Sequence, residues 1–110
     1  MKILNGNDEL LLLTILALKE NAYGATIMQS LSDVTHREWS IGAVYDPLHR
    51  LEKNGYVRSE LTMPTPERGG RSKRVYKVTN SGLDVLRQHQ SVRNKISQQV
   101  EDLIWNNSRK

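Results

Sequence analysis

SIGAVYDPLHRLEKN, residues 40–54, predicts an amphipathic helix of about four turns. Its apolar residues recur at steps of three or four, which is the spacing of one helical face. These residues are Ile41, Val44, Leu48 and Leu51. Ser40 precedes the pattern as an N-cap residue, and Asn54 and Gly55 follow it as a stop signal.

The outer face of this predicted helix carries an aromatic hydroxyl and basic groups. They belong to Tyr45, His49, Arg50 and Lys53. Such groups can bind phosphate oxygens, and side chains in the first turns of a helix can reach base edges in a major groove. The segment therefore predicts a recognition helix for DNA. The alternative is a solvated face, because Asp46 and Glu52 lie nearby.

A basic hairpin is predicted directly after this helix. Apolar and polar residues alternate over 56–63 and again over 74–79, which is the period of a half-buried strand. The connection contains Gly69 and Gly70, as turns often do. Five basic residues and one acidic residue lie within 66–77, a surplus that equals the formal net charge of +4 on the whole chain. The tip would lie along a phosphate backbone, or would otherwise be a solvated turn.

Two further helices are predicted before residue 40. The run LLLLTILAL at 10–18 is apolar on nearly every side, so we expect one face to meet its own domain and another to meet a second molecule. Tyr23 and Gly24 open the next helix, whose free amide groups could hold a phosphate. Alternatively, Tyr23 packs in the core and Gly24 permits a close approach.

The last predicted helix is longer than the domain it leaves. Residues 80–106 would span about 40 Å, against a width of about 25–30 Å for the preceding part of the chain. Its distal apolar stripe is typical of a partner surface, and the simplest partner is a second copy of the chain. The residues that we expect at this dimer interface are Leu11, Leu12, Ile15, Val92, Ile96, Val100, Leu103 and Ile104.

The composition excludes several classes of protein. The chain has 110 residues and no cysteine, so it is one modest domain without a disulfide framework or a thiolate metal site. The three histidines lack the spacing of metal ligands, and no catalytic motif is present. The apolar run at 10–18 is too short to cross a bilayer and lacks a signal-peptide cleavage site. We expect a cytoplasmic protein that is not an enzyme and needs no cofactor, metal or membrane.

The order of these elements resembles the PadR family of bacterial transcriptional regulators, in its short form with one C-terminal helix. The motifs that carry the resemblance are the run at 10–18, the pair Tyr23-Gly24, the pattern S-x-G-x-x-Y-x-x-L-x-x-L-E-x-x-G over 40–55, and GGR, RVY and VT-x-x-G within 69–82. The resemblance implies a mainly α fold with a small β-hairpin. Residues 1–79 would form a winged helix-turn-helix that binds DNA, and residues 80–110 a dimerisation helix. It also implies that Tyr45 contacts the DNA backbone and that the protein is a repressor.

Two expectations concern single residues. Family members usually have proline directly after the tyrosine, whereas here Asp46 stands between Tyr45 and Pro47. Proline at that depth removes a backbone hydrogen bond, so we expect a local irregularity in the helix. Trp105 either packs in the dimer or contacts a small hydrophobic effector, as aromatic residues do in some members of the family.

The predicted partner is double-stranded DNA, bound by a homodimer at a palindromic operator. The residues that we expect at this interface are Tyr23, Gly24, Ser40, Gly42, Tyr45, His49, Arg50, Lys53, Arg68, Gly70, Arg71, Lys73 and Arg74. The alternative is a winged-helix module that binds another protein through the basic hairpin.

Overall fold

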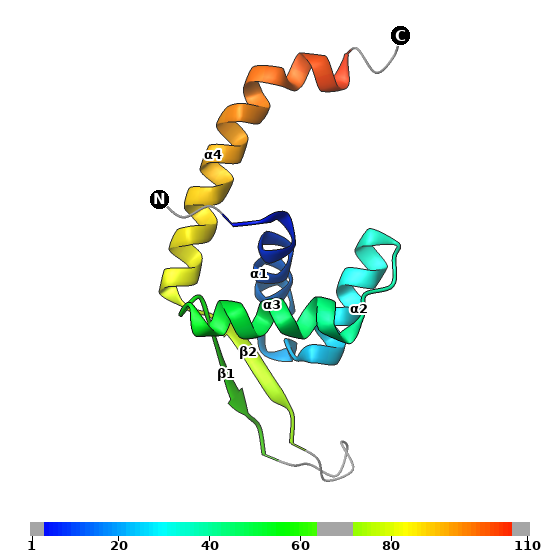
Figure 1. Ribbon diagram of the computed structural model, residues 1–110, viewed down its shortest axis with the longest axis vertical. Helices are drawn as coiled ribbons and strands as arrows, with labels where there is room; N and C mark the ends of the chain where they lie inside the picture. Colours follow the sequence, from blue (N-terminus) through cyan, green and yellow to red (C-terminus); the bar gives the residue numbers. More distant parts are fainter. Residues whose placement is uncertain (1–3, 64–71, 107–110) are drawn as a thin grey trace.

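The computed structural model describes residues 4–63 and 72–106. In this part of the chain the fold is mainly α with a small β-hairpin, as the sequence predicts. Its elements are α1 (Gly6–Leu18), a 3₁₀ turn (Lys19–Asn21), α2 (Gly24–Thr35), α3 (Ile41–Lys53), β1 (Val57–Leu61), β2 (Arg74–Val78) and α4 (Asn80–Trp105). The first three helices form the body, the hairpin projects from one side, and α4 leaves in the opposite direction (Figure 1).

The core lies where α1, α2 and α3 meet the base of the hairpin. Its fully buried side chains are those of Leu11, Leu12, Ile15, Ile27, Val44, Leu48, Leu51 and Val57. The two strands pair antiparallel, with Val57 opposite Val78 and Leu61 opposite Arg74. The backbone before α2 joins this sheet, because Tyr23 forms a bridge with Val75.

Short polar side chains fix where α3 and α4 begin. The Ser40 hydroxyl accepts a hydrogen bond from the Ala43 amide at 3.1 Å, which confirms the predicted N-cap of α3. Thr79 caps α4 by accepting from the Gly82 amide at 3.1 Å, and its hydroxyl also donates to the Gly55 carbonyl at 2.6 Å. One threonine therefore joins the end of α3 to the start of α4.

One prediction about α3 is wrong. Ile41 is 69% exposed instead of buried, because the first turn of the helix lies at the edge of the core, beside a groove between α2 and α3. The helix is assigned without a break from Ile41 to Lys53, with Pro47 inside it. The missing proline amide deprives one carbonyl of its donor. The fully buried Val44 and Leu48 hold the helix against the core on either side of that gap.

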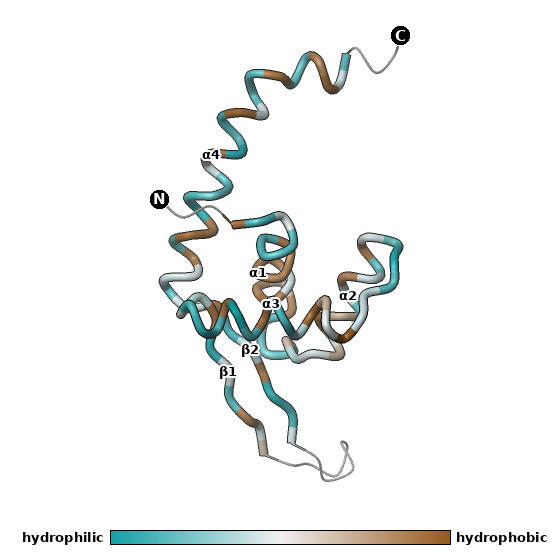
Figure 2. The backbone as a smooth tube through the Cα atoms, viewed as in Figure 1, coloured by the Kyte–Doolittle hydropathy of each residue, from teal (hydrophilic) through white to brown (hydrophobic). Residues whose placement is uncertain are grey.

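The predicted contribution of α1 to a dimer interface needs correction. Leu11, Leu12 and Ile15 are at most 2% exposed, so they belong to the core of their own protomer. A helix that is apolar all round buries one face and exposes another. The large apolar side chains exposed on α1 are those of Leu10, Leu13 and Leu16, at 36–39%. Figure 2 shows this hydrophobic character along most of α1.

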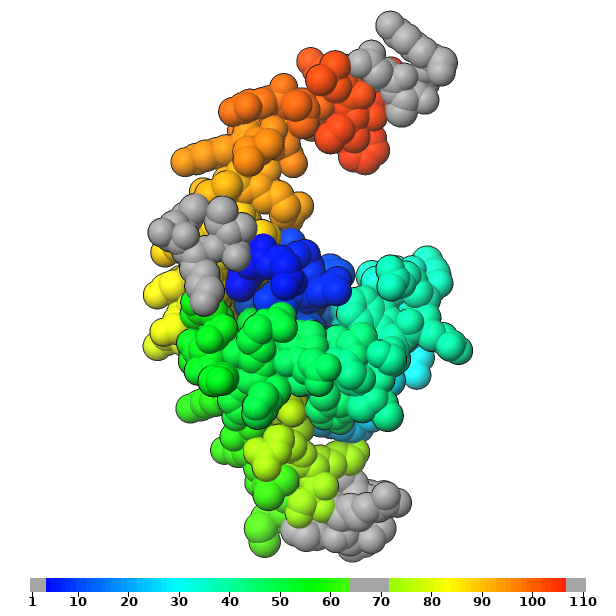
Figure 3. Space-filling model, in the orientation of Figure 1, coloured from blue at the N-terminus to red at the C-terminus, as the bar shows by residue number. Residues whose placement is uncertain are grey.

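Helix α4 has the predicted length and extends far beyond the body. It runs for 26 residues, and its buried residues, Gly82, Val85 and Leu86, all lie near its start. Farther along, Val92 and Val100 are half-buried, whereas Ile96, Leu103 and Ile104 are 52–61% exposed. The distal half stands clear of the body (Figure 3), and hydrophobic residues recur along it. The molecule is therefore elongated, measuring 56 × 32 × 21 Å.

Candidate nucleic-acid interface

Helix α3 exposes one continuous face to solvent. Gly42, Asp46, His49 and Lys53 recur on it at steps of four, three and four residues, and all four are exposed. Tyr45 lies at the edge of this face and is 40% exposed. The helix therefore offers a hydroxyl, an imidazole and an ammonium group along about three turns.

Tyr45 reaches from this face to the start of α2. Gly24 is buried, and a Cβ added to it would overlap the Tyr45 hydroxyl and ring. Gly24 therefore permits the close approach of Tyr45, which was one of the two interpretations of this glycine. The phenol is held beside the first turn of α2, where helix amide groups point outward.

Lys73 extends from the hairpin to the same place. Its ammonium group lies 3.8 Å from the centroid of the Tyr23 ring, a cation–π contact. Tyr23 itself is half-buried, and its amide donates to the Thr26 hydroxyl at 3.0 Å. The start of α2 is therefore surrounded by one cation and two tyrosines from three different elements.

A chain of hydrogen bonds fixes the hairpin against α3. Arg74 donates to the Ser59 hydroxyl at 3.0 Å, and that hydroxyl donates to the Glu52 carboxylate at 2.6 Å. Glu52 is thus directed to the hairpin and away from the exposed face of α3. Burial is the largest cause that raises the pKa of Tyr76, and the nearby Tyr45 and Glu52 raise it further. Arg74 acts in the opposite direction and lowers this pKa. Tyr76 therefore remains a neutral phenol at physiological pH.

Arg50 has a different position from that expected for a DNA contact. Its guanidinium lies 2.6 Å from the carboxylate of Asp8, whose side chain is only 9% exposed. This ion pair joins the last turn of α3 to the first turn of α1. The arginine side chain is 48% exposed, so part of it still faces solvent.

The next acidic residue of α1 makes a second link, to α4. The Glu9 carboxylate lies 3.4 Å from Nε of Arg93 and 3.6 Å from Nε2 of His89. The side chains of Glu9 and His89 are about nine-tenths buried. Two adjacent carboxylates in the first turn of α1 therefore hold α3 and α4. No sequence pattern indicates these links, beyond the acidic residues that helix starts favour.

The remaining predicted contacts have varied positions. Arg68, Gly70 and Arg71 lie outside the described residues. Arg74 is exposed on β2, and Ser40 is exposed at the N-cap of α3. Trp105 is 67% exposed near the end of α4. Ile41, which the periodicity assigned to the core, is an exposed residue that sequence reasoning missed.

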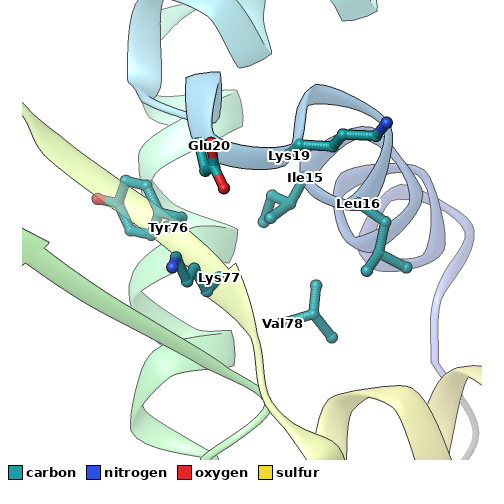
Figure 4. A pocket seen from close by; sticks show the side chains of 7 residues that line it. All are labelled: Ile15, Leu16, Lys19, Glu20, Tyr76, Lys77 and Val78. Carbon is teal, nitrogen blue, oxygen red and sulfur yellow. The ribbon is translucent and has the colours of Figure 1, made fainter.

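Two of the hollows that border these elements bear on ligand binding. The smaller, of about 210 Å³, lies between the end of α1 and β2 and is lined by Ile15, Leu16 and Val78 with Lys19, Glu20, Tyr76 and Lys77 (Figure 4). Small-molecule sites usually have about 300–1,000 Å³. The larger, of about 610 Å³, is the groove between α2 and α3 that Ile41, Tyr45 and Trp39 line. Trp105 borders neither hollow, so neither of them is the effector site suggested for that residue.

Metal-binding clusters and membrane spans do not occur in the part of the chain that the structure describes. Within residues 4–63 and 72–106, no three His, Asp or Glu side chains are grouped as a metal site would require. Over the same two ranges, no helix has the length and hydropathy needed to cross a bilayer.

Comparison with known proteins relates this geometry to one family. The model of the transcriptional regulator PadR-like family matches residues 12–88. The transcriptional regulator Rv3488 of Mycobacterium tuberculosis is 32% identical over 84 residues, which cover 76% of this chain and 74% of that protein.

Solved structures agree with the fold. A PadR family transcriptional regulator from Eggerthella lenta superimposes with a TM-score of 0.63 at 27% identity, over 84% of this chain and 81% of that one. A PadR-like transcriptional regulator from Bacillus cereus gives a TM-score of 0.68 at 21% identity, over 87% of this chain and 91% of that one.

Proposed function

Since the chain belongs to the PadR-like family of transcriptional regulators, we propose that it represses transcription as a homodimer bound to a palindromic operator. Members of this family are regulators that bind DNA, and they are not enzymes. The observation that carries the proposal is the exposed face of α3, with Tyr45 held over the start of α2 and Lys73 beside it.

In this proposal α3 enters the major groove. Tyr45 donates from its hydroxyl to a phosphate that also faces the first amide groups of α2. His49 and Lys53 follow the same groove, while Lys73 and Arg74 lie toward the neighbouring backbone. Gly42 leaves room for the helix to approach the duplex closely, because glycine has no side chain. The hairpin tip with Arg68, Gly70 and Arg71 would extend these backbone contacts.

The proposed homodimer covers the apolar residues that one protomer leaves exposed. On α1 these are Leu10, Leu13 and Leu16, and on the distal part of α4 they are Ile96, Leu103 and Ile104. Two recognition helices related by a two-fold axis would occupy half-sites about 34 Å apart. Trp105 would pack in this interface, where a flat hydrophobic effector could change the angle between the protomers.

Fluorescence anisotropy across a salt series tests the proposal. The probe is DNA that the wild-type protein selects from a randomised pool, with a scrambled duplex for comparison. Lys53→Ala should weaken binding and lower the salt slope by about one for each phosphate that is no longer neutralised. Lys95→Ala is the matched control, because this exposed lysine lies on α4 and away from α3.

The outcomes differ clearly. Two chains per duplex, preference for the selected DNA and a reduced slope in Lys53→Ala alone would support the regulator. Equal and weak binding to selected and scrambled DNA would contradict it and would favour a protein-binding module instead.

A further inference from the structure

Helix α3, which lies wholly within the described residues, exposes a single large aliphatic side chain. Its other large aliphatic residues Val44, Leu48 and Leu51 are at most 1% exposed, whereas Ile41 is 69% exposed. Isolated exposed apolar residues are common on protein surfaces and alone mean little. The position of Ile41 distinguishes it, because it is the first residue of the helix that faces the DNA in the proposed function.

The local backbone makes this side chain accessible to a duplex. The Ser40 hydroxyl caps the helix directly before Ile41, which fixes the direction of the first turn. Gly42 follows it, and the nearest atom that an added Cβ would meet there is the Asp46 carboxylate at 3.5 Å. Gly42 therefore adds no side chain that would hinder the approach of a duplex to this turn.

The chemistry of isoleucine limits what it can recognise. Its side chain has neither a donor nor an acceptor, so it cannot read the hydrogen-bonding pattern of a base pair. The apolar feature of the major groove is the 5-methyl group of thymine. In the proposed function, the phosphate contacts belong to Tyr45, His49 and Lys53.

Tyr45 supplies the register for such a contact. It lies four residues after Ile41, and both side chains line the groove between α2 and α3. A phosphate held at the Tyr45 hydroxyl would place the first turn of α3 inside the adjoining major groove. Trp39 and Met28 line the same groove.

From these observations we infer that Ile41 is a specificity-determining residue that contacts a thymine methyl group in each half-site. The inference rests on the proposed function. Ile41 would favour thymine over cytosine or uracil at one position of each half-site. It would not contribute to binding of the DNA backbone.

Replacement of thymine by deoxyuridine tests the inference, because it removes the methyl group and keeps every hydrogen-bonding group. Each thymine of the selected duplex is replaced symmetrically in both half-sites, and binding is measured by anisotropy. At one position the wild-type protein should lose about three- to fourfold in affinity per methyl group, or about tenfold for the pair. Ile41→Ala should bind the thymine duplex about as weakly and lose nothing further with deoxyuridine there.

Val34→Ala is the matched control. Val34 is also aliphatic and 76% exposed, but it lies near the end of α2. This variant should keep the wild-type affinity and the wild-type sensitivity to deoxyuridine. Thermal unfolding of Ile41→Ala should match that of the wild type, because the replaced side chain is exposed.

The possible results distinguish failure of the Ile41 contact from failure of the proposed DNA-binding function. Loss of deoxyuridine sensitivity at one position, in Ile41→Ala alone, would support the contact. Salt-dependent and specific binding, with the same deoxyuridine sensitivity in wild type and Ile41→Ala, would overturn the inference and leave the regulator in place. Absence of any specific DNA binding by the wild-type protein would overturn both.

Discussion

Gly82 lies in the first turn of α4, beside the residues that follow α3. A Cβ at this position would lie 2.7 Å from Cγ1 of Val78, which is 0.7 Å short of the 3.4 Å at which ordinary contact begins. It would also overlap the Tyr56 carbonyl oxygen, a backbone atom that accepts from the Thr79 amide at 3.0 Å. Because this acceptor cannot move without loss of that bond, Gly82→Ala must displace α4 itself.

The expected free-energy change can be bounded. Overpacking costs about 1–3 kcal/mol, while replacing a helical glycine by alanine gains at most about 1 kcal/mol. With the full gain subtracted, Gly82→Ala should therefore lower the free energy of unfolding by up to about 2 kcal/mol. Urea unfolding followed by circular dichroism, at one fixed protein concentration, measures this change.

Gly42→Ala is the internal control for this reasoning. Gly42 is a helical glycine too, but its nearest neighbour for an added Cβ is 3.5 Å away, so only the gain applies. This variant should be more stable by about 0.5–1 kcal/mol. Stabilisation of Gly82→Ala equal to that of Gly42→Ala would refute the steric argument, since the steric cost would then be absent.

Contacts of single side chains give three further predictions. Gly24→Ala should displace the Tyr45 phenol, which can rotate away, and should weaken DNA binding about tenfold in an anisotropy titration while the unfolding free energy changes little. Burial raises the pKa of Tyr76 above its value of about 10 in the unfolded chain, so the free energy of unfolding should fall as the pH rises above about 10. Urea titrations from pH 9 to 11 should show a smaller fall for Tyr76→Phe, and an unchanged fall would contradict this cause. Asp8→Asn should cost no more than about 1 kcal/mol in a thermal or urea melt, because the Arg50 side chain is 48% exposed, and a much larger loss would mean that the pair is not screened by solvent.

Local chemistry made much of this fold predictable from the sequence. The N-caps of α3 and α4 depend on residues three positions apart, which is why the sequence predicts the Ser40 cap directly. The hairpin and the length of α4 followed from periodicity in the same way. Close packing at Gly24 was only one of two interpretations, and Tyr45 was not predicted as the neighbour, because a glycine has no side chain to show which residue approaches it.

The remaining features depend on contacts between distant parts of the chain. Asp8 and Arg50 are 42 residues apart, and no spacing rule joins them. The periodicity placed Ile41 on the buried stripe, but it could not show where the neighbouring helices end. In α1, apolar residues occupy all sides, so hydrophobicity could not separate the buried Leu11 and Leu12 from the exposed Leu10.

The two carboxylates at the start of α1 have a mechanical consequence. Glu9 contacts Arg93, and beyond Arg93 helix α4 continues to Trp105 for about 18 Å. A tilt of about 10° at Arg93 would move the far end by about 3 Å, which is close to the rise of one base pair, about 3.4 Å. Asp8 contacts Arg50 of α3. In the proposed homodimer, α4 would pivot where Glu9 contacts it. A small change in its tilt would change the distance between the two recognition helices.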